Sequence, residues 1–258
     1  MRDLTVAVFR PDDERLGDAV ELIDSLGATA VPDPMLAVEP TDAVPRTDAD
    51  YVILTSKTGV ELVAAEGANA PTDGERKRWE PGDATVCAIG PKTADALEAA
   101  GYDVDIVPEE YTSSGLVAEL EEAVDGARVE VARSDHGSSV LLEGLEAAGA
   151  YLHETILYRL VRPPESGESV ALAAAGKLDA ACFTSSLTVE HWLEAAEVRG
   201  VREDALAGLE DATVGVIGEP TAETARAHGL EVDLVSSEAT FETLACETVE
   251  AAAPTYHE

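Results

Sequence analysis

Small hydroxyl residues and glycines follow apolar, β-branched runs at four places in the sequence. Thr55-Ser56 and Thr184-Ser185-Ser186 come directly after two of these runs. Gly90-Pro91-Lys92-Thr93 and Gly218-Glu219-Pro220-Thr221 come after two others. Where a strand ends and a helix begins, hydroxyls, exposed backbone N–H groups and the helix dipole together bind anions. Because both copies keep Thr-Ser and Gly-x-x-Thr-Ala, where Asp or Asn would cap a helix equally well, we predict anion binding in addition to helix capping.

Several kinds of chemistry are disfavoured by motifs that the sequence lacks. It contains neither GxGxxG nor GxxxxGK[ST], so dinucleotide and nucleoside-triphosphate binding lose their main support, and it has no GxSxG elbow. The five histidines are scattered and the three cysteines have no CxxC spacing, which argues against a metal site. Cys87 and Cys182 lie in apolar strand-like runs, where we expect buried free thiols. We therefore expect no metal site.

These motifs belong to an internal duplication that spans most of the chain. Three blocks occur twice, at residues 4–31 and 127–152, 51–63 and 180–193, and 86–120 and 214–248. The last pair keeps a constant offset of 128, as between Gly90 and Gly218, and Arg10 pairs with Arg133 in the first. The block order A-B-C-A′-B′-C′ indicates an ancient doubling of one unit.

Each block repeats the same order of elements. A short β-branched strand leads through a polar turn into a helix rich in Ala, Leu and Glu, which ends at a glycine. Gly27, Gly101, Gly149 and Gly229 stand at these helix ends, and each leads into another strand. Alternating strands and helices predict parallel sheets with right-handed crossovers and helices on both faces. We therefore predict an α/β protein with two doubly wound, flavodoxin-like parallel-sheet lobes of about 120 residues each.

The chain is strongly acidic. Its 258 residues include 52 Asp and Glu against 17 Lys and Arg, for a formal net charge of −35. The acidic residues are spread along every segment, so we interpret them as adaptation to a high-salt (halophilic) cytosol, where the Debye length falls to roughly 3 Å at molar salt. An acidic face for a basic partner would instead require clustering. Sequence-independent binding of nucleic acid is excluded because no strong basic cluster exists.

The sequence gives no sign of a membrane or export signal. No uninterrupted apolar run approaches the roughly 20 residues of a membrane span, and the segment from Met1 to Leu4 lacks the apolar stretch of a secretory signal. We therefore expect a cytoplasmic protein that does not contact a membrane. The polar stretch 66–83 reads as an irregular, charge-rich connection without an assigned role.

Taken in order along the chain, the motifs resemble uroporphyrinogen-III synthase. The matching segments cover essentially the whole chain: Arg10-Pro11, 55–60, 88–97, 107–116, Tyr158-Arg159, 183–189 and 216–225. Each segment alone is a weak signal, but the set and its spacing are specific.

The resemblance implies two α/β lobes joined by a two-stranded β-ladder, with the active site in the cleft between the lobes. A simple tandem reading of the duplication would place the lobes at 1–122 and 123–258. The resemblance implies instead the following parts: a discontinuous lobe of residues 1–35 and 163–258, a second lobe of residues 40–157, and a ladder of residues 35–40 and 157–164.

The family's reaction closes hydroxymethylbilane, a linear tetrapyrrole with many carboxylates, to uroporphyrinogen III with loss of water and inversion of ring D. Uncatalysed closure proceeds without inversion, so the enzyme has to hold its substrate in one folded pose. The resemblance thus implies a lyase of tetrapyrrole (heme and cobalamin) biosynthesis that needs no cofactor. We expect it to be a monomer, with transient contact with the preceding enzyme of the pathway.

Tyr158 matches the family's tyrosine that faces the cleft, and its phenol, with a reference pKa of about 10, would donate a proton to the departing hydroxide. The alternative is a tyrosine that merely packs across the ladder. The resemblance and the strand-end positions together give the expected substrate contacts: Arg10, Thr55, Ser56, Lys57, Lys92, Thr93, Tyr111, Thr112, Arg133, Thr184, Ser185, Ser186 and Thr221.

Two other functions remain as alternatives. A non-catalytic two-lobed sensor that closes on a small anion would be favoured by loss of the cleft tyrosine or of the Thr-Ser loops, and neither is seen. A nucleotide-dependent α/β enzyme is a weaker alternative because the phosphate-binding loops are missing.

Overall fold

The structure is a computed structural model that describes residues 4–65 and 78–253. Residues 66–77, the larger part of the polar stretch 66–83, lie outside the described residues. The chain divides into two compact units, which we call unit 1 (Met1–Ala37 and Val161–Glu258) and unit 2 (Val38–Leu160). Each unit is described by itself below.

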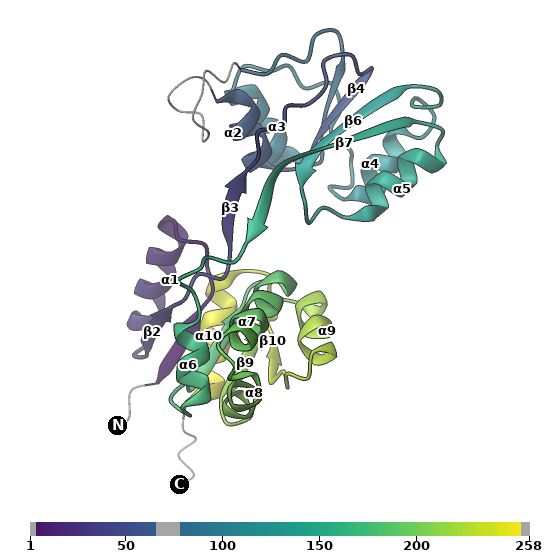
Figure 1. The fold of residues 1–258 in the computed structure, drawn as a ribbon. Helices are drawn as coiled ribbons and strands as arrows, with labels where there is room; N and C mark the ends of the chain where they lie inside the picture. Colours follow the sequence, from purple (N-terminus) through teal and green to yellow (C-terminus); the bar gives the residue numbers. More distant parts are fainter. Residues whose placement is uncertain (1–3, 66–77, 254–258) are drawn as a thin grey trace. The chain divides into compact units, whose positions relative to one another are not determined.

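Unit 1 is a three-layer α/β unit built on a five-stranded sheet (Figure 1). Its elements are β1 (Thr5–Val8), α1 (Glu14–Ser25), β2 (Thr29–Pro32), α6 (Glu168–Ala174), β8 (Ala180–Phe183), α7 (Ser186–Val198), α8 (Arg202–Glu210), β9 (Thr213–Val216), α9 (Glu219–Ala227), β10 (Leu234–Val235) and α10 (Phe241–Ala252). The strand order is β10-β9-β8-β1-β2, and every neighbouring pair is parallel. The predicted doubly wound parallel sheet is thereby confirmed for this unit.

Unit 2 repeats the arrangement in a sheet that also has five strands, with β3 at one edge. Its elements are β3 (Ala37–Pro40), β4 (Tyr51–Leu54), α2 (Lys57–Ala64), β5 (Thr85–Ala88), α3 (Pro91–Ala99), α4 (Ser113–Leu120), β6 (Arg128–Ser134), α5 (Ser139–Ala147) and β7 (Tyr151–Val161). The strand order is β3-β7-β6-β4-β5, with β5, β4, β6 and β7 parallel. In both units the carboxyl ends of the parallel strands therefore meet at one edge of the sheet.

The duplicated blocks are shared out between the two units. Unit 1 contains the first A block with the second B and C blocks, and unit 2 contains the first B and C blocks with the second A block. The strands correspond accordingly, so that β1 matches β6, β8 matches β4, and β9 matches β5. The simple tandem division at residue 122 therefore does not describe the units.

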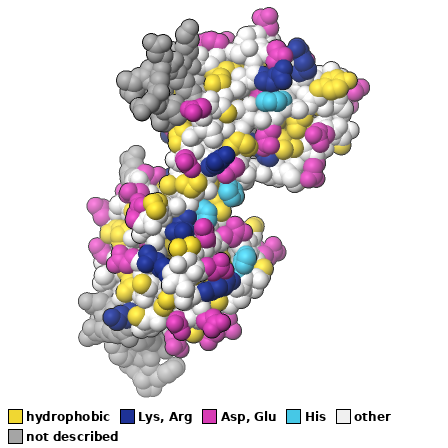
Figure 2. Space-filling model, viewed as in Figure 1, with side chains coloured by type: hydrophobic (Ala, Val, Ile, Leu, Met, Phe, Trp, Pro, Cys, Tyr) yellow, Lys and Arg dark blue, Asp and Glu magenta, His cyan; other side chains and the backbone are white. Residues whose placement is uncertain are grey.

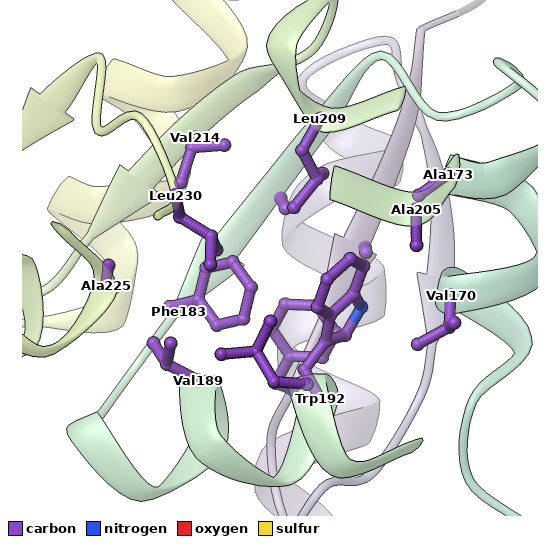
Figure 3. Close-up of a cluster of buried hydrophobic side chains, with 14 of the residues drawn as sticks. Val170, Ala173, Phe183, Val189, Trp192, Ala205, Leu209, Val214, Ala225 and Leu230 are labelled. Carbon is purple, nitrogen blue, oxygen red and sulfur yellow. The ribbon is translucent and has the colours of Figure 1, made fainter. Parts of the chain in front are cut away.

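Alternating strand residues bury opposite faces of the sheet, as a period of two requires. In β1, Val6 and Val8 pack with α1 and α10, whereas Ala7 joins Phe9 in the larger cluster under α6 to α9. Figure 3 shows the centre of this larger cluster, where the Phe183 and Trp192 rings meet edge to face with centroids 6.2 Å apart. Apolar layers thus pack against both faces of the sheet and hold its strands, and with them the strand-end loops, in position.

Both passages of the chain between the units lie in neighbouring strands. The chain leaves unit 1 at Ala37, in β3, and returns to it at Val161, the last residue of β7. The two strands are neighbours in the sheet, and the Thr41 N–H donates to the Leu157 carbonyl oxygen at 2.9 Å. This is the two-stranded ladder of the fold.

The segment that precedes β3 is held in place by the hydrogen bonds of a buried carboxylate, Asp33. Asp33 is 2% exposed and accepts the backbone N–H groups of Gly167 and Ser169 at 2.7 and 2.8 Å, together with the Ser169 hydroxyl. Ser169 Oγ in turn accepts the Trp192 indole N–H at 3.0 Å. Asp33 therefore occupies the N-terminus of α6, where helix N–H groups lack intrahelical partners and favour an anion.

Candidate active site

Tyr158 and Ser56 form a hydrogen-bonded pair at the carboxyl edge of the unit 2 sheet. Tyr158 lies towards the end of β7, is 6% exposed, and donates from Oη to Ser56 Oγ over 3.0 Å. Ser56 is the N-cap of α2, and its Oγ also accepts the Gly59 N–H at 3.0 Å. Because both hydrogen bonds use Ser56 Oγ as the acceptor, the Ser56 hydroxyl proton is free to donate to a third group.

Two local features set this geometry. The β6–β7 pairing shifts register between Arg133 and Ser134, so that Ser134 lies opposite Tyr158, and such irregularities re-aim side chains at the ends of strands. Gly59 gives the hydroxyl room, since a Cβ there would lie 3.2 Å from Ser56 Oγ and 3.3 Å from a Leu157 methyl. The position of the Tyr158 phenol therefore depends on a strand irregularity and on a glycine in the adjacent helix.

The glycine turns at Gly90 and Gly218 begin two helices without a capping side chain. Both glycines are extended and are followed by proline within the first two helical positions, in α3 and α9 respectively. Pro91 and Pro220 have no N–H, and the Thr93 and Thr221 N–H groups donate to the carbonyl oxygens of Gly90 and Gly218. In the described structure the Lys92 and Glu219 N–H groups therefore remain to serve an anionic ligand. Tyr111, which is 62% exposed, packs against the Gly90 turn, where a Cβ would lie 3.2 Å from the Tyr111 Cβ. Ser56, Tyr158, Gly90 and Tyr111 thus share one edge of unit 2.

The expected threonine contacts differ in their surroundings. Thr93 and Thr221, the third residues of α3 and α9, are each 4% exposed, so little of either side chain reaches solvent. Thr112 is exposed and caps α4 by accepting the Gly115 N–H at 3.0 Å. Thr55 and Thr184 are half-buried directly before the N-cap serines Ser56 and Ser185.

The matching edge of unit 1 connects the start of α7 to the start of α9. Ser185 caps α7 in a reciprocal capping box with Thr188. Ser186 Oγ donates to the Pro220 carbonyl oxygen at 3.1 Å and accepts from Thr224 Oγ1 at 2.8 Å. The two duplicated motifs of unit 1 therefore touch one another, but Ser185 has no counterpart of the Tyr158 phenol among its hydrogen-bond partners in the described residues.

The duplicated arginines have diverged. Arg133 is 6% exposed, forms an ion pair with Glu154, and donates from Nη1 to the Ser138 carbonyl oxygen at 2.6 Å. Its guanidinium is thus committed to contacts within unit 2. Arg10 Nε, in contrast, is buried with no hydrogen-bond partner, and the guanidinium lies over the Phe241 ring at 5.1 Å.

Arg10 lines a cavity at the carboxyl edge of unit 1. The cavity has a volume of about 310 Å³ and lies where α1 and α10 begin. Its other charged lining residues are Arg15, Asp18 and Glu242, and Arg15 is paired with Asp13. Burial and the neighbouring Arg15 lower the pKa of Arg10 from its usual value. Among the described side chains, no carboxylate forms an ion pair with Arg10, so a carboxylate of a ligand would complete its contacts.

The two lysines of the expected site have different surroundings. Lys57 forms an exposed i,i+4 ion pair with Glu61 at 3.4 Å, which leaves it only weakly restrained. Lys92 is exposed on the first turn of α3, beside Gly90. Both lie at the same edge of unit 2 as Ser56.

Comparison with known proteins decides the family. The family model described as uroporphyrinogen-III synthase HemD matches residues 17–246. A protein of Methanothermobacter thermautotrophicus, provisionally named uroporphyrinogen-III synthase, is 34% identical over 239 residues, which cover 87% of this chain and 90% of that protein.

The chain belongs to the uroporphyrinogen-III synthase family. This family consists of enzymes, the hydro-lyases of porphyrin biosynthesis, so membership favours the enzyme over the non-catalytic sensor. Within the described residues no helix has the length and apolar character that crossing a membrane would require.

Solved structures of uroporphyrinogen-III synthases share the fold. A mutant of the Thermus thermophilus protein aligns over 96% of this chain and 98% of its own, with a TM-score of 0.60 and 19% identity. The Helicobacter pylori protein aligns over 97% of this chain and all of its own, with a TM-score of 0.61 and 15% identity. At these identities the likeness supports the fold and carries no residue roles.

Asp135 lies next to the Tyr158 strand at the carboxyl edge of the unit 2 sheet, and it was not among the site residues expected from the sequence. It accepts the Leu160 N–H at 3.0 Å and a hydrogen bond from His136 Nδ1 at 2.8 Å, and its own N–H donates to the Tyr158 carbonyl oxygen. Burial alone would raise the pKa of Asp135, but the bonds from His136 and the Leu160 N–H outweigh it and lower the pKa. Asp135 therefore holds the strand that carries Tyr158.

Two of the cysteines lie away from solvent, and no metal cluster forms in the described part of the chain. Cys87 and Cys182 are buried free thiols, as predicted, and burial raises the pKa of each to about 12. Among the described residues, no group of three or more His, Cys, Asp or Glu side chains is placed to hold a metal ion.

Proposed function

We propose that this chain is a uroporphyrinogen-III synthase that closes hydroxymethylbilane with inversion of ring D. Protonation and loss of the terminal hydroxyl as water leaves an electrophilic azafulvene. Ring D attacks it through its substituted carbon, and the resulting spiro intermediate fragments and recloses with loss of a proton from the ring carbon. The net reaction releases one molecule of water and consumes no oxidant, so the chain has to supply a proton donor and a fixed substrate pose.

The observation that carries this proposal is the Tyr158–Ser56 hydrogen bond. Two neutral hydroxyls in a chain can pass a proton outwards, with Ser56 donating towards the leaving hydroxyl while Tyr158 donates to Ser56. Ser56 is the more exposed member of the pair, and Tyr158 is held among apolar neighbours of the unit 2 core. We assign the proton donation to this pair, with Tyr158 as its source. The proton released at ring closure restores the phenol.

The remaining site residues supply the pose. In each unit the carboxyl edge offers uncapped helix N–H groups, at Gly90 in unit 2 and at Gly218 in unit 1. Arg10 offers a guanidinium whose Nε has no hydrogen-bond partner within the described residues, and Thr112, Ser186 and Lys92 add polar side chains at the same edges. A substrate with many carboxylates requires such dispersed donors. We therefore propose that these groups bind its acetate and propionate arms. Arg133 does not bind substrate in this proposal, because its contacts within unit 2 stabilise the strand ends.

We also propose that the chain works as a monomer in the cytosol of a salt-rich cell and receives its substrate by transient contact with the enzyme that makes it. The dispersed Asp and Glu side chains over both units support the salt-rich setting (Figure 2). The spontaneous closure of free hydroxymethylbilane to the uninverted product supports direct transfer. Light scattering at 0.1 and 2 M KCl tests the monomer, and product isomers with and without the preceding enzyme test the transfer.

The deciding experiment is to incubate the protein in 2 M KCl with freshly made hydroxymethylbilane and to determine the isomer ratio of the product. We expect an excess of the inverted type III isomer over the type I isomer that forms in buffer alone. A folded protein that yields only type I product would overturn the proposal. Tight binding of hydroxymethylbilane without acceleration of closure would favour the non-catalytic sensor instead.

A further inference from the structure

A cavity of unit 2 lies at the amino ends of its strands, the edge of the sheet opposite Tyr158 and Ser56. It has a volume of about 360 Å³ and is lined by the residues before β4 and by the first residues of β6 and β7. Tyr151, at this end of β7, and Tyr158 are seven residues apart, which corresponds to roughly 23 Å along a strand. The cavity is therefore separate from the candidate active site.

A fully buried carboxylate borders this cavity, and one of its oxygens lacks a hydrogen-bond partner among the described residues. Glu130, in β6, is 0% exposed, and its Oε2 lies 2.7 Å from Nδ1 of His153, its cross-strand neighbour in β7. Because a carboxylate only accepts, Nδ1 carries the proton of this hydrogen bond. Glu130 Oε1 is buried, and it has no hydrogen-bond partner in the part of the chain that the structure describes. Buried polar atoms are nearly always paired in folded proteins, so this oxygen calls for a donor from outside the chain.

The arginines at the cavity are neutralised by aspartates. Arg46 makes two hydrogen bonds of 2.8 Å to Asp48, and Arg128 binds Asp50 at 2.9 Å and lies 3.5 Å from Asp48. Figure 2 shows Lys and Arg side chains gathered over β4 and β6, beside a histidine and among acidic groups. Both arginines are therefore paired with aspartates, whereas Glu130 keeps one oxygen, Oε1, without a hydrogen-bond partner among the described residues. An anionic ligand would have to displace an aspartate and is disfavoured.

The remaining lining is largely apolar. Val129, Ala150, Leu152 and the 71% exposed Tyr151 surround the charged groups. A bare metal ion would not use these surfaces, whereas an amine with an apolar chain or ring would place its ammonium at Glu130 and its carbon skeleton against them. The His153 side chain, which is 49% exposed, has to rotate away before a ligand can reach Glu130.

We propose that this cavity is a binding site for a small primary amine, held by Glu130 Oε1 and packed against Tyr151. The site is independent of the proposed catalytic function, since none of its residues belongs to the carboxyl edge of the sheet.

The test is a titration monitored by ligand-observed NMR at constant 2 M KCl, using three probes that share a phenyl ring: 2-phenylethylammonium, 2-phenylethanol and 3-phenylpropanoate. We expect the ammonium to bind at least about tenfold more tightly than the alcohol, and the carboxylate not to bind. Glu130→Gln removes the charge while keeping the shape and should weaken ammonium binding about tenfold or more. Glu203→Gln, an exposed carboxylate in unit 1, is the matched control and should bind as wild type does.

A second variant keeps the proposal open to refutation if Glu130→Gln fails to fold. Arg46 is exposed, and Arg46→Gln releases Asp48 and adds a negative charge to the cavity, so ammonium binding should tighten, whereas mere damage to the cavity would weaken it. Equal affinities for ammonium and alcohol, unchanged ammonium binding in Glu130→Gln, or no binding at millimolar ammonium would each overturn the proposal. In the last case a buried water would be the partner of Glu130 Oε1.

Discussion

Tyr158 Oη donates to Ser56 Oγ at 3.0 Å, which joins the strand that carries the phenol to the N-terminus of α2. The two residues are separated by 102 positions in the chain. A single hydrogen bond thus links the family's tyrosine motif to one of the duplicated Thr-Ser motifs. Since unit 1 has the Thr-Ser motif without the tyrosine, the two edges are expected to contribute unequally to catalysis.

The first prediction separates proton donation from binding. Tyr158→Phe keeps the ring in the unit 2 core and should lower kcat by roughly 10²- to 10⁴-fold. Thr93→Ala and Thr221→Ala are matched hydroxyl deletions at buried sites and should lower it by less than about tenfold. Single-turnover rates with hydroxymethylbilane measure these differences. If the phenylalanine variant retains the wild-type kcat, the leaving hydroxyl takes its proton from water or from a substrate carboxyl.

The duplicated arginines provide a second, internally matched test. Arg10→Gln should raise KM about five- to tenfold with little change in Tm, because the guanidinium is unpaired and available to a substrate carboxylate. Arg133→Gln should instead cost about 3 kcal/mol of unfolding free energy, at the low end for a broken buried pair because Glu154 is one-third exposed. Steady-state kinetics and urea unfolding give the two readouts. Equal loss of stability in both variants would contradict the assigned difference.

Asp135 predicts a pH dependence of stability. Its pKa is lowered in the folded chain, so its stabilising contribution is fully present above the unfolded value of about 3.9 and is lost as the pH falls through the folded value. Asp135→Asn should therefore lower Tm at pH 6, and the deficit should shrink below about pH 3.9, where aspartic acid resembles asparagine. Thermal unfolding followed by circular dichroism from pH 6 to pH 3 in 2 M KCl measures it. A deficit that stays constant over this range would show that His136 and Leu160 gain nothing from the charge.

The dispersed acidic surface predicts a rise of activity with salt. In dilute buffer the global field of a chain with net charge −35 opposes the approach of a polyanionic substrate, and molar salt removes this repulsion. Short-range contacts such as those of Arg10 are screened less. We therefore expect kcat/KM to increase between about 0.1 and 2 M KCl at temperatures where the protein stays folded. A steep fall with salt would reveal a positive steering patch and refute this interpretation.

The fold was largely predictable because its signals are local. The alternation of strands and helices predicted the parallel sheets, and Gly27, Gly101, Gly149 and Gly229 all have the positive φ of helix-terminating glycines. Burial of Cys87 and Cys182 followed from the apolar runs around them.

The environments of the site residues could not be read in the same way, because they depend on distant partners. Arg10 and Arg133 occupy equivalent positions of the repeat, yet Arg133 forms an ion pair with Glu154 from a different strand, and no such pair of Arg10 is seen among the described side chains. Thr93 and Thr221 match a binding motif but lie buried on the inner side of their helices. The partnership of Ser56 with Tyr158 likewise arises only from the pairing of β7 with β6.

The division of the chain into units sets the order in which they can be completed during synthesis. Unit 2 is continuous, so it can finish folding as soon as Leu160 has left the ribosome. In unit 1, by contrast, β1 pairs on one side with β8, which ends at Phe183. The buried Asp33 likewise lacks its partner until Ser169 has been made. At a rate of synthesis of about 5–20 residues per second, β1 therefore lacks its neighbour β8 for roughly 10 to 30 s. The first segment of unit 1 therefore stays without its final strand partner until β8 has been made.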